Sequence, residues 1–195
     1  TFVCGKKMTK SNFKLKIFFL INIFLLCLIA VLSSEASNTK NNLIVLGSDK
    51  APVKIKIFSS FTCPHCANFH FKVIPEIKRE YVDRGKVQLI FIDFPLDQAA
   101  FNASKLLHCV DKNKQINFMD TIYKNQNKWT AGKNIDEINN NLKNIVKDLG
   151  VNSTGFDNCL NNETIADKIL NERINGHKKY SIESTPTIVI NEKKL

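Results

Sequence analysis

Residues 53–66 read VKIKIFSSFTCPHC, and this stretch decides the fold. Its first six residues alternate apolar and polar side chains and end in an apolar pair, a pattern typical of a β-strand that enters a core. Cys63 and Pro64 then open a helix, because apolar side chains recur every fourth residue from Phe69 to Tyr81. A proline fits the first helical turn, where no backbone donor is required. The cysteines of this stretch therefore lie where a strand turns into a helix.

The segments on either side extend this turn into a strand-helix-strand unit. Pro75 is expected to kink the helix and Gly85 to end it. Residues 87–94 form a second strand candidate, and residues 43–46 are expected to pair beside 53–58. This arrangement indicates an α/β fold.

Beyond this unit the apolar period becomes helical. Apolar residues follow the i, i+3, i+4, i+7 template in segments near 96–110, 116–123, 135–149 and 165–174. Residues 187–190 then read as a strand directly after Pro186, and 191–194 read as a turn into another strand. The sequence therefore predicts an α/β fold with an all-helical insertion over about 96–174, followed by a returning strand.

The composition favours one globular domain. Apolar residues make up 44% and charged residues 24% of the chain, and no repeat or low-complexity segment is present, which excludes solenoids. The formal charge of +10 comes partly from lysines near the N-terminus, since residues 37–195 carry 23 basic and 17 acidic side chains. The remaining lysines are scattered and form no stripe with aromatic residues, so we expect no nucleic-acid partner.

Residues 1–36 have the layout of an N-terminal extension followed by a signal peptide. A lysine-rich stretch that contains Met8 precedes the apolar run 17–32, and small residues stand before a predicted cut after Ala36. The run is shorter than the roughly 20 residues that cross a bilayer as a helix, and an uncleaved anchor is the alternative. The domain is therefore expected over 37–195, exported to the periplasm.

Cys63 and Cys66 have the spacing of a redox pair. Only a thiolate attacks a disulfide, and Cys63 is expected at the exposed start of the helix, where unpaired N–H groups and the helix dipole favour an anion. Cys66 lies one turn inside and is expected to be shielded. Pro64 and His65 complete the motif, and His65 is expected to donate a hydrogen bond or add positive charge beside the thiolate. The pattern predicts that Cys63 exchanges disulfides with a substrate and that Cys66 resolves the mixed disulfide.

The other cysteines and histidines leave alternatives open. Cys-x-x-Cys is also half of a zinc site, and His70 follows Cys66 at a metal-like interval. No second Cys-x-x-Cys is present and an exported protein meets oxidising conditions, so we predict no metal and no cofactor. Cys109 and Cys159 fall in the helical insertion and are expected to form a structural disulfide, with two buried free thiols as the alternative. His108 is expected on a helix surface or in the core.

Residues 58–66 resemble the active-site strand and turn of the DsbA family of bacterial disulfide oxidoreductases, and residues 184–187 (Ser-Thr-Pro-Thr) resemble that family's second signature. The resemblance covers roughly residue 43 to the end. It implies a thioredoxin fold, a cis Pro186 beside the cysteine pair, and a Thr185 backbone that binds a substrate strand. It also implies oxidation of newly exported, cysteine-containing proteins and reoxidation by a membrane partner of the DsbB type.

The sequence departs from this family in two places. The family's well-known members carry a buried glutamate in the strand before the motif, where Ile57 stands here. DsbA-like domains also continue with another strand and a helix beyond the turn near Asn191, so the domain is expected to be truncated at its C-terminus.

Two other functions compete with thiol oxidation. One is a disulfide isomerase or reductase of the same fold, but such proteins usually need a separate dimerisation domain, and few residues separate the predicted cut from the first strand. We also expect a monomer. The other is a non-catalytic envelope protein that binds metal through Cys63, Cys66 and His70.

Overall fold

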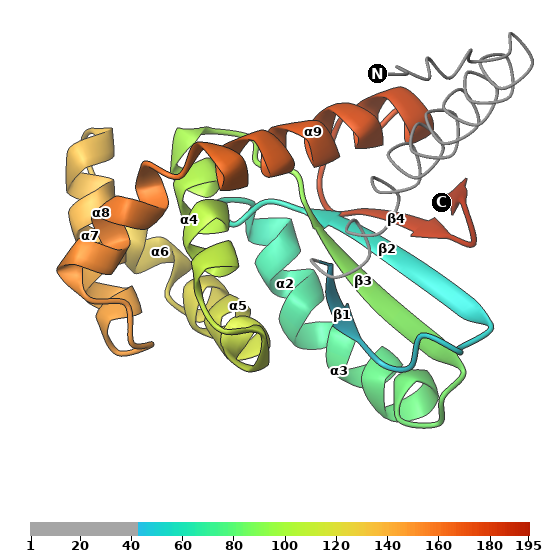
Figure 1. Ribbon diagram of the computed structural model, residues 1–195. Helices are drawn as coiled ribbons and strands as arrows, with labels where there is room; N and C mark the ends of the chain where they lie inside the picture. Colours follow the sequence, from blue (N-terminus) through green and yellow to red (C-terminus); the bar gives the residue numbers. More distant parts are fainter. Residues whose placement is uncertain (1–42) are drawn as a thin grey trace, which may run out of the picture. The chain divides into compact units, whose positions relative to one another are not determined.

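A mixed β-sheet forms the centre of the fold, with helices on both faces (Figure 1). The structure is a computed structural model that describes residues 43–195. Within these residues, five strands follow the order β1-β3-β2-β4-β5. Their bounds are β1 Ile44–Leu46, β2 Val53–Ser59, β3 Val87–Asp93, β4 Thr187–Ile190 and β5 Lys193–Lys194. β2 and β3 are parallel, and the other neighbouring pairs are antiparallel.

β1 pairs with β3 at one edge of the sheet. Its Ile44 stands opposite Phe91 in an antiparallel register, so the expected pairing of residues 43–46 with β2 is wrong. β2 is central, because β3 pairs with one of its edges and β4 with the other. The edge of β3 that faces away from β2 is the one left for β1. The predicted order of strand, helix and parallel strand is confirmed.

Helices occupy the long connections. The helix after β2 is divided into α2 (Pro64–Lys72), α3 (Ile74–Ile77) and a π-helical turn (Lys78–Val82). The segment between β3 and β4 contains α4 Gln98–Cys109, a 3₁₀ turn Lys112–Lys114, α5 Gln115–Lys124, α6 Gln126–Trp129, α7 Ile135–Lys147, α8 Ser153–Leu160 and α9 Glu163–Tyr180. This segment is the predicted helical insertion, except that α9 continues past residue 174.

The break between α2 and α3 has a local cause. α2 ends at Lys72 and α3 begins at Ile74. Pro75 has no N–H to donate to the carbonyl of Phe71, and its ring crowds that carbonyl. The kink that the sequence predicts at this proline is confirmed.

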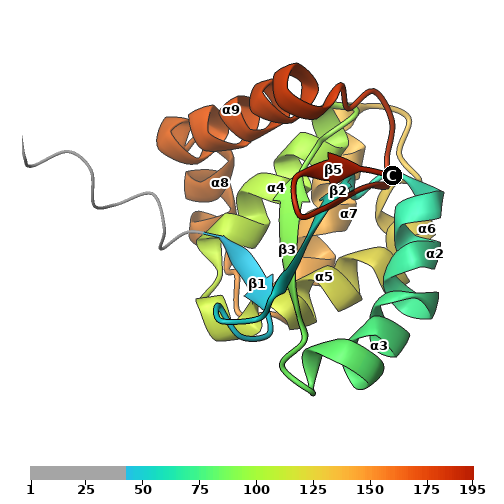
Figure 2. The same ribbon diagram turned by 90° about the vertical axis from the view of Figure 1, so that its right-hand side faces the viewer.

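The two faces of the sheet carry separate cores, because side chains alternate along each strand. Ile57 of β2 points into the larger core, to which α2, α4, α5 and α7 all contribute. Phe58 points to the opposite face, where it packs with Phe94 and Val189. Figure 2 shows α9 along this side of the sheet. α9 comes close at Gly176, where a Cβ atom would lie 2.7 Å from the Phe58 ring.

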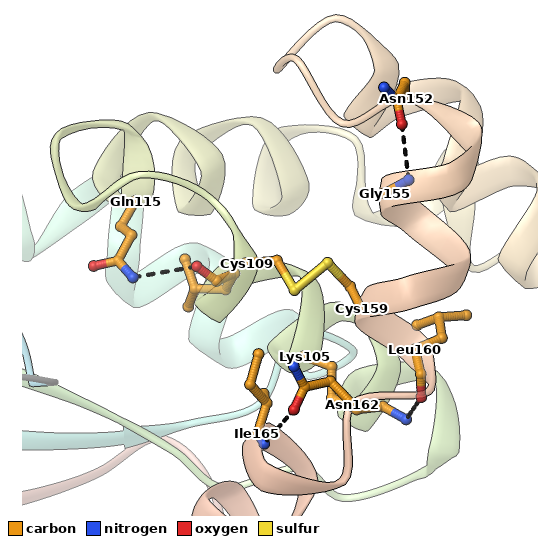
Figure 3. Close-up of a disulfide and its surroundings, with 10 residues drawn as sticks. Lys105, Cys109, Gln115, Asn152, Gly155, Cys159, Leu160, Asn162 and Ile165 are labelled. Carbon is orange, nitrogen blue, oxygen red and sulfur yellow. Dashed lines mark hydrogen bonds between the residues drawn. A yellow bond between two sulfur atoms is a disulfide. The ribbon is translucent and has the colours of Figure 1, made fainter.

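A disulfide joins two helices of the insertion (Figure 3). Cys109 is the last residue of α4 and Cys159 lies near the end of α8, with 6.1 Å between their Cα atoms and a sequence separation of 50. One turn before Cys109, Lys105 donates a hydrogen bond to the carbonyl of Leu160. The bridge therefore fastens α8 to α4 beside a second contact, and it joins the pair that the sequence predicts.

The part of the chain that the structure describes has no helix long and apolar enough to cross a membrane. The predicted N-terminal extension and signal peptide, residues 1–36, lie outside the described residues. Export and a domain that starts at residue 37 therefore stay predictions.

Candidate active site

The cysteine pair lies at the first turn of α2. Cys63 is the N-cap residue, with extended backbone angles, and Pro64 is the first helical residue. The N–H groups of Cys66 and Ala67 donate to the carbonyl of Cys63 at 3.1 and 3.2 Å, which closes the turn. Pro64 has no N–H, but the first N–H groups of a helix have no helical acceptor, so no bond is lost. The predicted place of the pair at a helix N-terminus is confirmed.

A segment far away in the sequence completes the site. The Thr185–Pro186 peptide bond is cis. The Cys63 thiol donates a hydrogen bond to the carbonyl oxygen of Thr185, with 3.3 Å between sulfur and oxygen. Thr187, directly after this loop, pairs with Phe58 of β2, shortly before the cysteines. The pairing of β2 with β4 therefore holds the two segments side by side.

Both active-site cysteines are largely covered. Cys63 is 7% exposed and Cys66 is 2% exposed. The expectation that Cys63 is exposed is wrong, because the loop that carries Thr185 lies against its sulfur. Cys63 is nevertheless the more accessible of the two, as the sequence predicts.

The two thiols differ in acidity. Burial by itself raises the pKa of Cys63. The side chains of Thr185 and Cys66 and the backbone N–H groups of Cys66 and His65 stabilise the thiolate, outweigh burial and hold the pKa below the usual 9.0. Cys66 lies deeper. Its burial is the main cause that raises its pKa to about 12, and the neighbouring Cys63 sulfur adds to this rise. Cys63 therefore becomes a thiolate far more readily than Cys66.

His65 contributes to the site through its backbone. Its N–H helps to lower the pKa of Cys63. Its imidazole is exposed and forms no hydrogen bond or ion pair with any residue of 43–195. The predicted effect of the imidazole charge on the thiolate stays a prediction.

Three polar residues that the sequence analysis did not single out hold the active-site turn. The Gln126 amide donates to the carbonyl oxygens of Phe61 at 2.7 Å and Cys63 at 3.1 Å. The Thr62 hydroxyl donates to Asp97 Oδ2 at 2.7 Å, while Asp97 Oδ1 caps α4. Asp97 stands directly before an apolar helical period, so the N-cap signature could have found it. No pattern marks Gln126, whose role depends on α6 folding back onto the turn.

Comparisons with known proteins agree with this geometry. A family model described as thioredoxin matches residues 39–195. The crystal structure of alpha-DsbA1 from Wolbachia pipientis aligns with a TM-score of 0.70 at 33% sequence identity, covering 77% of this chain and 75% of that one. The chain is a DsbA-like member of the thioredoxin family.

Further relatives support this placement. The protein named "Probable disulfide bond formation protein D" of Bacillus cereus is 33% identical over 152 residues, which is 75% of this chain and 68% of that protein. The crystal structure of oxidised BdbD from Bacillus subtilis aligns with a TM-score of 0.66 at 24% identity, over 79% of this chain and 84% of that one, and supports the fold alone. The predicted thioredoxin fold with a helical insertion is confirmed.

In this DsbA-like protein a small cavity lies beside Cys66. Its wall is mostly apolar, and Ile57 of β2 forms part of it, while Ser59, His70 and Tyr123 supply polar atoms. Burial raises the pKa of Tyr123 well above its usual value and the nearby Cys66 adds to this, although a hydrogen bond with Ser59 opposes the rise. Tyr123 therefore stays a neutral hydroxyl.

A metal site made of Cys63, Cys66 and His70 would need their donor atoms to converge. Among the residues from 43 to 195, these three do not form a group whose donor atoms all lie within 4.8 Å of one another. His70 instead pairs through Nε2 with Asp120 Oδ1 at 2.6 Å. The geometry therefore favours the redox interpretation of the Cys-x-x-Cys pair over the metal interpretation.

A second polar cluster lies at the end of β3, where Asp93 pairs with Ser59. Buried Asp93 accepts hydrogen bonds from Ser104 at 2.6 Å and from His108 Nε2 at 2.7 Å. Glu172 and Lys168 of α9 lie against this pair, and burial together with Asp93 raises the pKa of Glu172. Because Lys168 balances part of the negative charge, we interpret the cluster as an ion network that fastens α4 and α9 to the sheet.

Proposed function

We propose that this DsbA-like protein-disulfide oxidoreductase introduces disulfides into newly exported proteins, using the bond that Cys63 and Cys66 form with each other. The observation that supports this most is the placement of the two thiols on one helical turn, with Cys63 at the helix N-terminus beside the cis-proline loop and Cys66 buried behind it, which gives them opposite shifts in pKa. A thiolate that is stabilised in the reduced protein makes the disulfide of the oxidised protein a stronger oxidant. The pair therefore favours taking electrons from substrates.

The reaction takes two exchanges. A substrate thiolate attacks the Cys63 sulfur, the Cys63–Cys66 bond breaks, and Cys66 leaves and takes up a proton. A second substrate thiolate then attacks the substrate sulfur of the mixed disulfide and expels Cys63. Cys63 leaves readily, because a sulfur with a lowered pKa is the better leaving group. Two electrons pass from the substrate to the protein.

The cis-proline loop supplies the substrate site in this proposal. Thr185 places its carbonyl oxygen 3.3 Å from the Cys63 sulfur. A substrate strand that lies along Thr185 and Pro186 would bring its own cysteine to the same sulfur. Main-chain recognition of this kind accepts many sequences, as an oxidase of varied substrates requires.

Location and partners belong to the same proposal. The predicted signal peptide supports work in the periplasm, where unfolded proteins arrive with free thiols. After each cycle the Cys63 thiolate must pass its electrons on, and we propose a quinone-linked membrane partner of the DsbB type. The oxidase is proposed to act as a monomer.

Trapping with two single variants tests the function. The oxidised wild type should convert a reduced two-cysteine peptide to its disulfide, and Cys63→Ser should show only the uncatalysed rate. Cys66→Ser, activated as a mixed disulfide at Cys63, should form a covalent adduct with the peptide that mass spectrometry detects.

Two results would contradict this function. One is an adduct at Cys66 in the Cys63→Ser variant, because the deeper sulfur would then be the point of attack. The other is zinc bound stoichiometrically by the purified reduced protein, which would favour the metal-binding alternative. Net reduction of substrate disulfides in a glutathione buffer would instead indicate the reductase or isomerase.

A further inference from the structure

The exchange at Cys66 requires a proton to move inside the protein. When Cys66 leaves the disulfide it must gain a proton, since its pKa is about 12. When the reduced protein is oxidised again, the same thiol must lose that proton before its sulfur can attack Cys63. Cys66 is 2% exposed, so bulk water does not reach it freely.

The cavity beside Cys66 offers a route for this proton. It has about 10 Å³ of room, close to the lower limit for a single water molecule. Among the residues that line it, Ser59 and Tyr123 carry hydroxyl groups, and burial keeps Tyr123 neutral. His70 is the lining side chain whose ring nitrogens can both accept and donate a proton.

His70 also reaches the outside. It follows Cys66 by one helical turn, so both side chains lie on the same face of α2. It is 7% exposed, yet it lines both the small cavity beside Cys66 and a larger groove of about 530 Å³. In that groove its Nε2 meets Asp120, whose side chain is 52% exposed.

The hydrogen bond to Asp120 sets the chemistry of the ring. A carboxylate accepts and does not donate, so Nε2 carries the proton of this bond. In the neutral imidazole, Nδ1 is then left with a free lone pair that can act as a base. Asp120 and the Tyr123 ring, whose centroid lies 5.0 Å from that of His70, hold the imidazole in place.

We propose that His70, oriented by Asp120, relays the proton between Cys66 and solvent during each disulfide exchange. This inference rests on the proposed function, because it concerns the same two sulfurs. His70 is a positioning and relay residue rather than a nucleophile, and it forms no bond to the substrate.

The proton balance closes in both directions. When a substrate thiolate attacks Cys63, the leaving Cys66 sulfur takes a proton from protonated His70, and His70 recovers one from solvent through the groove. During reoxidation, the Cys63 thiolate attacks a disulfide of the oxidant, whose S–S bond breaks, so one oxidant sulfur stays bound to Cys63 and the other becomes a thiolate. Neutral His70 then removes the proton of Cys66, and the Cys66 sulfur attacks Cys63 and expels the bound oxidant sulfur. The expelled sulfur leaves as a thiolate, and His70 releases its proton to solvent.

Few other charges face His70. Cys66 lies on its own helix, and Asp120 and Tyr123 approach from α5. Lys78 and Lys124 line the same larger groove. Of these groups, Asp120 is the one within hydrogen-bond distance of the ring, so its substitution should change the relay most after that of His70 itself.

Stopped-flow oxidation by glutathione disulfide separates the two exchanges. In the reduced wild type, Cys63 forms a mixed disulfide with glutathione and Cys66 then resolves it. In His70→Gln the first step should keep its rate, whereas resolution should slow roughly 100-fold near neutral pH. Resolution in the variant should also rise about tenfold per pH unit, because hydroxide must now remove the proton, while the wild-type rate should level off.

Two further variants keep this test sharp. Asp120→Asn, at a half-exposed position, keeps a hydrogen-bond partner but loses the carboxylate, and should slow resolution roughly tenfold. Lys124→Gln changes the charge of the same groove without contacting His70, and should resolve at the wild-type rate. Should His70→Gln fail to fold, Asp120→Asn alone decides, since unchanged resolution in it overturns the relay.

The relay and the proposed function fail in different ways. Resolution in His70→Gln that is unchanged, or slowed equally at every pH, overturns the relay while mixed-disulfide formation at Cys63 still supports the function. A wild-type Cys63 that reacts only at the pH of an ordinary thiol overturns the function and the relay together.

Discussion

The described part of the chain contains two pairs of cysteines with opposite surroundings. Cys63 and Cys66 lie at the N-terminal turn of α2, where backbone N–H groups point at the first sulfur. Cys109 ends α4, and Cys159 lies in the last turn of α8. The helix dipole favours a thiolate at a helix N-terminus and disfavours one at a C-terminus.

This difference shows how one residue type can serve two purposes in one domain. The first pair closes a small ring beside a loop that can present a substrate, so its bond can be exchanged. The second pair spans a sequence separation of 50 and joins two packed helices, so its bond restricts the unfolded chain. The position of each sulfur on its helix, rather than the presence of the sulfur, separates the reactive pair from the structural one.

The largest expected effect is on reactivity within the first pair. At pH 7 the thiolate fraction of Cys66, with a pKa of about 12, is at least roughly 10³-fold below that of Cys63, whose pKa lies below 9.0. Iodoacetamide should therefore alkylate Cys63 of the reduced protein and leave Cys66 intact, as peptide mass mapping over a range of pH would reveal. Equal labelling of both cysteines would show that Cys63 and Cys66 do not differ in reactivity.

The second pair should matter for stability instead. Replacing Cys109 and Cys159 together by alanine should lower the free energy of unfolding by about 4 kcal/mol, from the chain entropy of the opened loop. For a chain of this size that corresponds to a fall in Tm of about 8–16 °C. Thermal unfolding of both proteins measures the change, and Cys63 alkylation, which should keep its rate, is the control. A Tm within about 2 °C of wild type would mean that the bridge constrains little.

The pH dependence of stability should carry the signature of the first pair. The lowered pKa of Cys63 stabilises the folded reduced protein above the pKa of an unfolded thiol, 9.0, and this contribution is lost as pH falls through the folded value. The raised pKa of Cys66 stabilises the folded reduced protein at pH values below 9.0. This contribution is lost as pH rises towards about 12, by up to about 1.4 kcal/mol per pH unit. The contribution of these two thiols to the stability of the reduced form should therefore be greatest near pH 9.0.

Denaturant unfolding at a series of pH values tests this curve. The oxidised protein, in which neither active-site sulfur titrates, is the reference to subtract. A difference between the two forms that does not change with pH would show that the two thiols are not perturbed by folding.

The smallest effect concerns the helix that connects the two pairs. α4 begins at the Asp97 cap beside the active-site turn and ends at Cys109. Asp97→Ala should cost about 1 kcal/mol through loss of the cap and of the Thr62 hydrogen bond. Asp97→Asn keeps a capping oxygen and should recover most of this loss. Chemical denaturation measures the free energy of unfolding of the wild type and the two variants. If the alanine variant is as stable as the asparagine variant, the helix cap does not contribute the expected stability.

The sequence predicts correctly those features of the fold that depend on neighbouring residues. The alternation of 53–58, the proline at the helix start and the kink at Pro75 follow from properties of single residues and their neighbours, and each was predicted correctly. The partner of β1 was predicted wrongly, because a strand of three residues does not encode which sheet edge is free.

The surroundings of the cysteines were harder to predict, since they come from distant segments. The cover over Cys63 is a carbonyl 122 residues further along the chain. The amide of Gln126 reaches the same turn from a helix that no motif marks. Such contacts depend on how the helical insertion folds back on the sheet, which the period of its apolar residues does not determine.

The glycine in α9 has a mechanical consequence. α9 has 18 residues and is about 27 Å long. It follows α8 in the chain and precedes the cis-proline loop. Gly176 of α9 comes close to the Phe58 ring, and β2 leads from that ring to the turn that carries Cys63. A methyl group at position 176 would meet the Phe58 ring, so α9 or the ring would have to shift. The absence of one side chain therefore sets how closely α9 approaches the strand that leads to Cys63.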